Sequence, residues 1–173
     1  LNILMMLMRR CGFYKKKPDL NKYKKIILIR NPIDREISNY NYYKNFNKKF
    51  NLNKFDEFKE YNFKDYINSK LFLDNIITRI LCNKMLKNEK IYNNDFLLAL
   101  SMCQNSSIVF FNQIKNFVKK EFKIKNLRKK NYNKNKSIKF FYKSNIDKKD
   151  LELIKKYNKF DLNLYNKFKH IKY

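Results

Sequence analysis

The sequence predicts an α/β fold with few strands. Residues 26–29 (Ile-Ile-Leu-Ile) form a continuous aliphatic run, which is typical of a parallel strand buried on both faces. A second short apolar run, Ser107–Phe111, is the candidate for another strand. Apolar residues at helical spacing fill much of the remaining chain, above all its C-terminal half. Strands that alternate with helices and loops favour the α/β class.

Caps and apolar spacing delimit the helices. Asn31 is a good N-cap and Pro32 suits the first helical position, so a helix should run from Pro32 to about Lys48. Asp34 and Glu36 favour the positive end of this helix. Further helices are expected over Leu71–Leu86, Asp95–Gln104, Gln113–Phe122 and Asp147–Lys169, with a basic loop over Lys123–Lys143.

Composition limits the class of protein without naming a partner. The 173 residues fit one domain, and 44% hydrophobic residues suffice for a core. A net charge of +26 suggests anionic partners such as a nucleotide, an acidic glycan, nucleic acid or an acidic membrane. A chain rich in Lys and Asn and poor in Gly also matches the drift of an AT-rich genome. Charge alone therefore identifies no partner.

The rare residues exclude several kinds of site. The single glycine, Gly12, leaves no Gly-rich phosphate loop within this sequence. Three cysteines without CxxC spacing indicate neither a zinc site nor a disulfide framework, and Cys82 and Cys103 are expected as buried thiols. The apolar stretch Leu1–Met8 is too short to span a bilayer, and a first residue other than Met suggests a fragment of a longer reading frame.

Residues 25–43 carry the most informative pattern. A strand delivers Arg30 to its carboxyl end, where open α/β sheets bind ligands, and the N-terminus of the next helix faces the same crevice. Arg35, Ser38 and Tyr42 share one face of that helix because their spacings are three and four. Guanidinium and hydroxyl donors suit a phosphate, although an arginine at a strand end can equally form a plain ion pair.

The same residues resemble a known signature. Arg30, Pro32, Arg35, Ser38 and Tyr40 are similar to the 3′-phosphate motif of the sulfotransferases, a strand ending in R-[DN]-P followed by R and S. The resemblance implies that Arg30 and Ser38 hold the 3′-phosphate of 3′-phosphoadenosine 5′-phosphosulfate (PAPS). Asn31 stands where an acidic residue is common in that family.

Three further segments extend the resemblance to glycan sulfotransferases of the heparan sulfate 2-O/6-O type and their bacterial relatives. They are residues 74–82, residues 99–122 and residues 158–165, so the similarity covers about Lys24 to Phe168. It implies a P-loop-NTPase-like sulfotransferase fold, with a partial central parallel sheet flanked by helices. The chain would be a single domain fragment (1–173) that lacks the N-terminal 5′-phosphosulfate loop.

The resemblance also suggests subsidiary site residues. Asn75 and Arg79 lie on one helix face and are candidates to bind the acceptor glycan, and the equal alternative is a salt bridge of Arg79 that positions the helix. Asn133 and Lys136 are cofactor candidates in a basic loop that is also of low complexity. Asp161 and Tyr165, four residues apart, are expected to hold the last helix in place.

Two parts of the family's chemistry are missing from the sequence. The phosphosulfate loop and the general base, usually His or Glu, are expected before Leu1, so no catalytic residue is assigned. His170 is expected as a solvated tail residue, and no metal is required. Asn112 stands where relatives commonly carry Glu.

The predicted function is transfer of a sulfuryl group from PAPS, the only cofactor expected, to a glycan hydroxyl, although this fragment alone should be inactive. The partners would be the nucleotide donor and a glycan that could be acidic. No specific nucleic acid is expected, and any membrane contact would come from an upstream anchor. The compartment would be the cytoplasm in a bacterium or the Golgi lumen in a eukaryote. The alternatives are a basic nucleic-acid-binding module, supported by interleaved Tyr and Phe, and a catalytically dead remnant of the fold.

Overall fold

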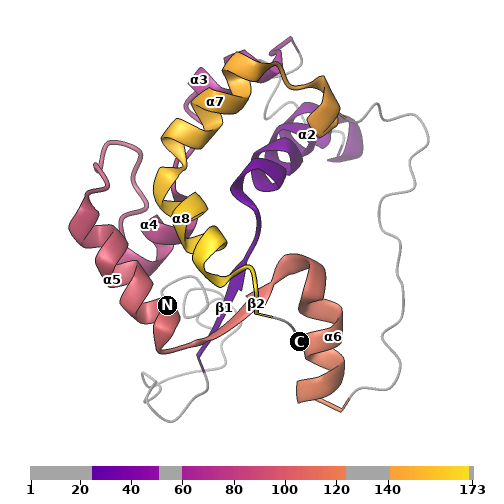
Figure 1. Ribbon diagram of the computed structural model, residues 1–173. Coiled ribbons are helices and arrows are strands. Elements are labelled where there is room, and N and C mark those ends of the chain that lie inside the picture. Colours follow the sequence, from indigo (N-terminus) through magenta and orange to yellow (C-terminus); the bar gives the residue numbers. More distant parts are fainter. Residues whose placement is uncertain (1–24, 51–59, 124–140, 172–173) are drawn as a thin grey trace, which may run out of the picture.

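The computed structural model describes residues 25–50, 60–123 and 141–171. Two short strands lie side by side, with α5 and α6 beside them and the other helices above them in the view of Figure 1. The elements are β1 (Ile26–Ile29), α2 (Pro32–Phe50), α3 (Phe63–Asn68), α4 (Ile76–Cys82), α5 (Asn93–Gln104), β2 (Ser107–Phe110), η3 (Phe111–Gln113), α6 (Ile114–Glu121), η4 (Lys143–Asn145), α7 (Lys148–Tyr157) and α8 (Lys159–Phe168). This helix-rich α/β arrangement confirms the predicted class.

The two strands form a parallel sheet, as the sequence predicts. Their register pairs Ile26 with Ser107 at one end and Ile29 with Phe110 at the other, so both strands end at the same edge. A parallel pair requires a long crossover, and α2 to α5 supply it between β1 and β2.

The prediction that β1 is buried on both faces is wrong for the part of the chain that the structure describes. Ile29 is buried, but Ile26 and Leu28 are 45% and 40% exposed. Successive side chains of a strand point to opposite faces, and the cluster formed with α5 and α8 covers the face of β1 that carries Ile27 and Ile29.

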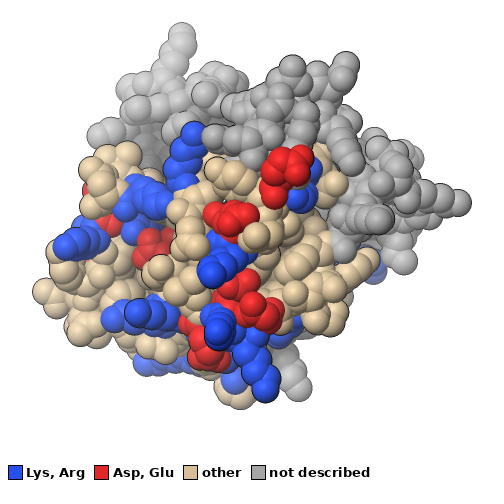
Figure 2. Space-filling model, turned by 90° about the horizontal axis from the view of Figure 1, so that it is seen from above, with Lys and Arg blue, Asp and Glu red and all other residues tan. Residues whose placement is uncertain are grey.

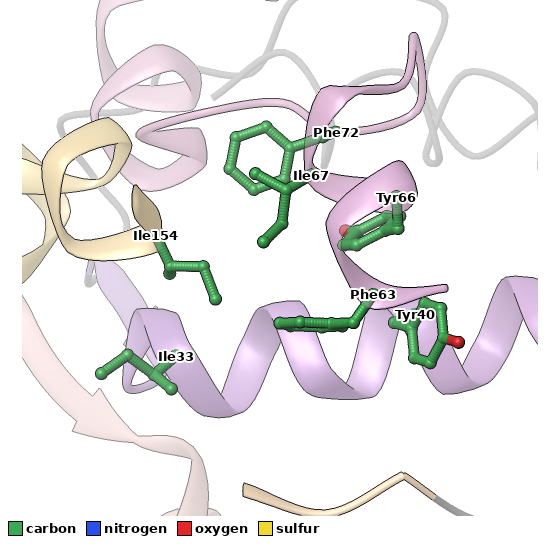
Figure 3. Packing of buried hydrophobic residues seen from close by; sticks show 7 residues of the cluster. All are labelled: Ile33, Tyr40, Phe63, Tyr66, Ile67, Phe72 and Ile154. Atoms are coloured by element: carbon green, nitrogen blue, oxygen red, sulfur yellow. The ribbon is translucent and has the colours of Figure 1, made fainter. Parts of the chain in front are cut away.

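The first of two apolar clusters joins α2, α3 and α7. Tyr40 and Phe63 meet edge-to-face with ring centroids 5.2 Å apart, and Ile154 of α7 closes the cluster (Figure 3). Such aromatic pairs add to the burial of their area. The remaining buried members are Ile33, Tyr66, Ile67 and Phe72. This cluster fixes α2, whose N-terminal end follows β1 directly.

The second cluster joins the sheet to α5 and α8. Ile29 of β1 and Phe110 of β2 pack with Ala99 and Cys103 of α5 and with Leu164 of α8. In Figure 1, α5 and α6 flank the strands on opposite sides, and α8 descends onto their carboxyl ends. The edge where β1 and β2 end is therefore held by α8.

Most helix boundaries agree with the sequence, and two do not. The helix expected over Leu71–Leu86 shrinks to α4, because Asn75 and Asn83 at its two ends adopt positive φ angles of 45° and 59°. Asparagine tolerates this left-handed conformation better than most residues do. The helix expected over Asp147–Lys169 is two helices, α7 and α8, which meet at Asn158.

No helix in the ranges given above is long and apolar enough to cross a membrane.

We predict that Leu164→Ala lowers the free energy of unfolding by about 2–5 kcal/mol, because this fully buried side chain fills the cluster between the sheet and α8. Leu98→Ala is the matched control, since Leu98 is 52% exposed on α5, and it should change stability by about 0.5 kcal/mol or less. Chemical denaturation followed by circular dichroism measures both values. Equal losses in the two variants would contradict this packing.

Candidate functional site

A pocket opens where the two parallel strands end. It has a volume of about 250 Å³. Its lining residues come from both strand ends, from the first turn of α2 and from α8: Ile29, Arg30, Asn31, Asp34, Phe110, Phe111, Asn112 and Tyr165. The carboxyl edge of a parallel sheet is the usual place for a ligand in an open α/β fold. The sequence predicted a crevice at this place.

Arg30 is the positively charged residue of this pocket. Its guanidinium carbon lies 4.8 Å from the centroid of the Phe111 ring. Among the described residues, no ion pair joins Arg30 to a carboxylate, not even to Asp34 in the same pocket. A guanidinium that stacks on a ring keeps its in-plane N–H groups available for an anion.

The other two arginines of the described ranges have internal partners. Arg35 binds Glu36 and Asp161, with N–O distances of 2.7 Å in both ion pairs. Arg79 pairs with Asp74 at 2.6 Å and donates to the backbone oxygens of residues 84, 86 and 89. Arg35, which the spacing places on one helix face with Ser38 and Tyr42, is therefore turned into the protein interior and does not line the pocket.

The start of α2 is occupied by its own cap. Asn31 Oδ1 accepts the Ile33 N–H at 2.9 Å, and Pro32 has no N–H to offer. The expectation that free N–H groups of the first turn face the crevice is thus only partly met, because capping already uses one of them. The charge of Arg30 is the stronger feature for an anion here.

Ser38 lies half-buried on α2, one turn beyond the pocket residue Asp34. Positions four apart on a helix share a face, so Ser38 continues the line of the pocket, although it does not line the pocket itself. Nearby, Asn41 exchanges two hydrogen bonds of 2.8 Å with the backbone of Phe141. The chain thus re-enters the described ranges beside α2. Asn133 and Lys136, in the segment before Phe141, lie outside the described residues.

A buried polar network stands behind this site, and the carboxylate of Asp161 is its centre. Asp161 Oδ2 accepts from Arg35 Nη1 at 2.7 Å and from the Ile77 N–H at 2.9 Å. Asp161 Oδ1 accepts from the N–H and the hydroxyl of Thr78 at 2.9 and 2.8 Å. A carboxylate that receives four donors is well satisfied without water. It ties α2, α4 and α8 together, which confirms the expected structural role of Asp161.

The charges of this network stabilise one another. Burial by itself lowers the pKa of Arg35, but the charges of Glu36 and Asp161 outweigh it and raise that pKa. Burial and the neighbouring Glu36 raise the pKa of Tyr66, whose hydroxyl donates to Glu36 Oε2 at 2.7 Å. Arg35 therefore stays charged and the Tyr66 hydroxyl stays protonated over the physiological range.

Asn75 and Arg79 belong to the same interior. Asn75 is 3% exposed and donates its side-chain amide to Asp74 and to the Tyr157 carbonyl. Its amide oxygen accepts from the N–H of Phe160 and Asp161 at the start of α8. Arg79 is 2% exposed and organises the loop after α4. These contacts agree with the alternative that the sequence left open, in which a salt bridge of Arg79 positions the helix. We therefore do not place Asn75 and Arg79 in the ligand site.

Sequence reasoning missed Phe111 as a site residue. The run Ser107–Phe111 was predicted as one strand, but pairing ends at Phe110 and Phe111 begins η3 beside Arg30. A parallel pairing of the two predicted strands could have indicated this residue, because the residues that follow two paired strand ends are neighbours. Tyr165 also lines the pocket and meets Phe110 edge-to-face at 5.5 Å, in keeping with its expected role in holding α8.

A family model described as "Sulfotransferase family" matches residues 7–169, most of the chain. The chain belongs to the sulfotransferase family. No match was found among curated proteins or among solved structures. The matched range includes β1, the pocket and the Asp161 network of this sulfotransferase, so membership supports sulfuryl transfer as its activity.

Among the described residues of the sulfotransferase, the two cysteines and the histidine do not line the pocket. Burial raises the pKa of Cys103 to about 11, and Cys82 is half-buried, with its thiol at 2.9 Å from the Asp95 carbonyl. Both are therefore protonated thiols, although Cys82 is less buried than expected. His170 is exposed, as predicted. Over residues 25–50, 60–123 and 141–171, no group of three or more His, Cys, Asp or Glu could hold a metal ion.

We predict that Asp161→Asn destabilises the sulfotransferase by about 3–5 kcal/mol, because Arg35 would keep its buried charge and lose a carboxylate partner. Glu152→Gln is the control, since Glu152 forms an exposed ion pair with Lys155 on α7 that contributes about 1 kcal/mol or less. Urea denaturation measures both changes. If Asp161→Asn were no worse than the control, the network would not hold the helices together.

Proposed function

We propose that this sulfotransferase uses PAPS as its donor and that the strand-end pocket holds the 3′-phosphate of the nucleotide. The observation that carries the proposal is the position of Arg30 at the carboxyl ends of both strands. Of the three described arginines, it is the one that forms no ion pair with a described carboxylate. Arg30 would be the main phosphate ligand. Ser38 would add a hydroxyl donor, and Asn133 and Lys136 further donors.

The chemistry of the pocket supports an anion with a sugar attached. Arg30 presents a fork of donors that fits phosphate oxygens, and the pocket is large enough for a phosphate and part of a ribose. Asp34, Asn31 and Asn112 add polar groups around the cation that suit hydroxyls. Because Asp34 offsets one charge of the lining, binding depends on Arg30 rather than on a general positive potential.

We further propose that the acceptor is a glycan hydroxyl. Its oxygen attacks the sulfur, the bond from sulfur to the donor's phosphate oxygen breaks, and 3′,5′-phosphoadenosine leaves while a base takes the hydroxyl proton. The sequence resemblance to glycan sulfotransferases supports this acceptor class. We assign no catalytic residue, because none of the described pocket residues is the His or Glu that this resemblance implies as base.

The distribution of charge argues against a nucleic-acid module. On the face shown in Figure 2, lysine and arginine side chains are interspersed with acidic ones rather than gathered in one stripe. Non-specific nucleic-acid binding needs a continuous positive track for the phosphates. The discrete pocket at Arg30 is the more specific feature.

We predict that 3′,5′-phosphoadenosine binds the protein saturably and that Arg30→Ala weakens this binding by about 1.5–3 kcal/mol, roughly ten- to a hundredfold. Titration calorimetry gives the dissociation constants. Lys149→Ala, which removes an exposed positive charge from α7, is the control and should leave them unchanged. If both variants lose affinity equally, or if any polyanion competes and salt abolishes binding, the nucleic-acid alternative is favoured.

We predict that Ser38→Ala weakens the same binding by about 1 kcal/mol, roughly fivefold, because it removes one donor to the phosphate. Alanine suits a helix at least as well as serine, so the melting temperature should stay close to that of the parent. Unchanged affinity in this variant would remove Ser38 from the site. Transfer of labelled sulfuryl from PAPS to any of a panel of glycans would show that the protein is an active enzyme and not a binding remnant of the fold.

A further inference from the structure

Phe111 occupies an unusual place for an aromatic residue. It directly follows Phe110, which pairs with Ile29, so it lies one position beyond the last rung of the sheet and next to Arg30. Its side chain is 50% exposed and belongs to neither apolar cluster. The ring contact that the described residues give it is the one with Arg30. Core packing therefore does not explain the aromatic ring at this position.

The contact with the Phe111 ring determines which groups Arg30 can bind. The guanidinium carbon lies 4.8 Å from the ring centroid, and the acidic residue that shares the pocket, Asp34, forms no ion pair with Arg30 among the described contacts. A flexible arginine four residues before a carboxylate could bind it and neutralise the pocket. Stacking uses the face of the guanidinium and leaves its N–H groups in the plane for an incoming anion.

We propose that Phe111 is a positioning residue that holds the Arg30 guanidinium open toward the pocket and thereby sets the preference for a nucleotide with a 3′-phosphate. This inference rests on the proposed function of the pocket. The ring acts through Arg30. Part of the rotamer freedom that an arginine loses on binding is already lost in the stacked state, so the phosphate meets an ordered donor fork.

The test is the ratio of two affinities, that for 3′,5′-phosphoadenosine divided by that for 5′-AMP, which lacks the 3′-phosphate. Calorimetry on the full 173-residue chain supplies both constants. Phe111→Leu should lower the ratio about two- to fivefold, because a cation–π contact at an exposed site has this size. Phe111→Tyr keeps the ring and should keep the ratio. Phe122→Leu, which alters an exposed aromatic at the end of α6, is the control and should not change it.

A double-mutant cycle shows whether the ring acts through the arginine. In the Arg30→Ala background, Phe111→Leu should cause no further loss of the ratio. A full additional loss there would mean that the ring contacts the nucleotide itself, and the inference would be overturned. It would also fail if Phe111→Leu left the ratio unchanged while Arg30→Ala lowered it. An unchanged ratio in Arg30→Ala alone would instead overturn the proposed function of the pocket.

Discussion

The carboxylate of Asp161 is the interaction on which the arrangement of this molecule depends. Burial of this charge costs free energy, and four hydrogen-bond donors offset the cost. They come from Arg35 on α2 and from the first turn of α4. Each donor comes from a different part of the chain than α8 itself. Because the buried carboxylate needs all four donors, few other arrangements of these helices are possible, even where their apolar faces could pack in several ways.

The site inherits its geometry from this network. Arg35 sits one turn into α2, so fixing it fixes the start of the helix, the cap at Asn31 and the turn out of β1 that carries Arg30. On the other side of the pocket, Tyr165 of α8 packs on Phe110, one residue before Phe111. Arg30 and Arg35, five residues apart, therefore have different roles. Arg35 anchors the start of α2 through Asp161, and Arg30 lines the pocket without an ion pair among the described residues.

Local signals explain what the sequence could reveal. Asn31 and Pro32 mark a helix start by their own chemistry, and the run 26–29 marks a strand, so both were predictable without any tertiary knowledge. The parallel pairing and the pocket followed from the position of Arg30 after that strand. The break at Asn158 was not predicted, and the partners of its side chain were not predictable, because its amide oxygen accepts from Arg35 and from the Asn75 N–H in distant segments. The sequence left two roles open for Asn75 and Arg79, because the spacing of polar side chains on a helix does not show whether they contact a substrate or a buried partner.

The long sequence separation between Arg35 and Asp161 has a consequence for biosynthesis. The bond from Arg35 to Asp161 spans 126 residues, so α2 can find this partner only after α8 has left the ribosome. Until then the Arg35 guanidinium, which is buried in the folded protein, stays exposed to water without its Asp161 partner. A chain that stopped before α8 would keep Arg30 and Phe111 but lack Tyr165 of the pocket and Asp161, the shared partner of α2 and α4.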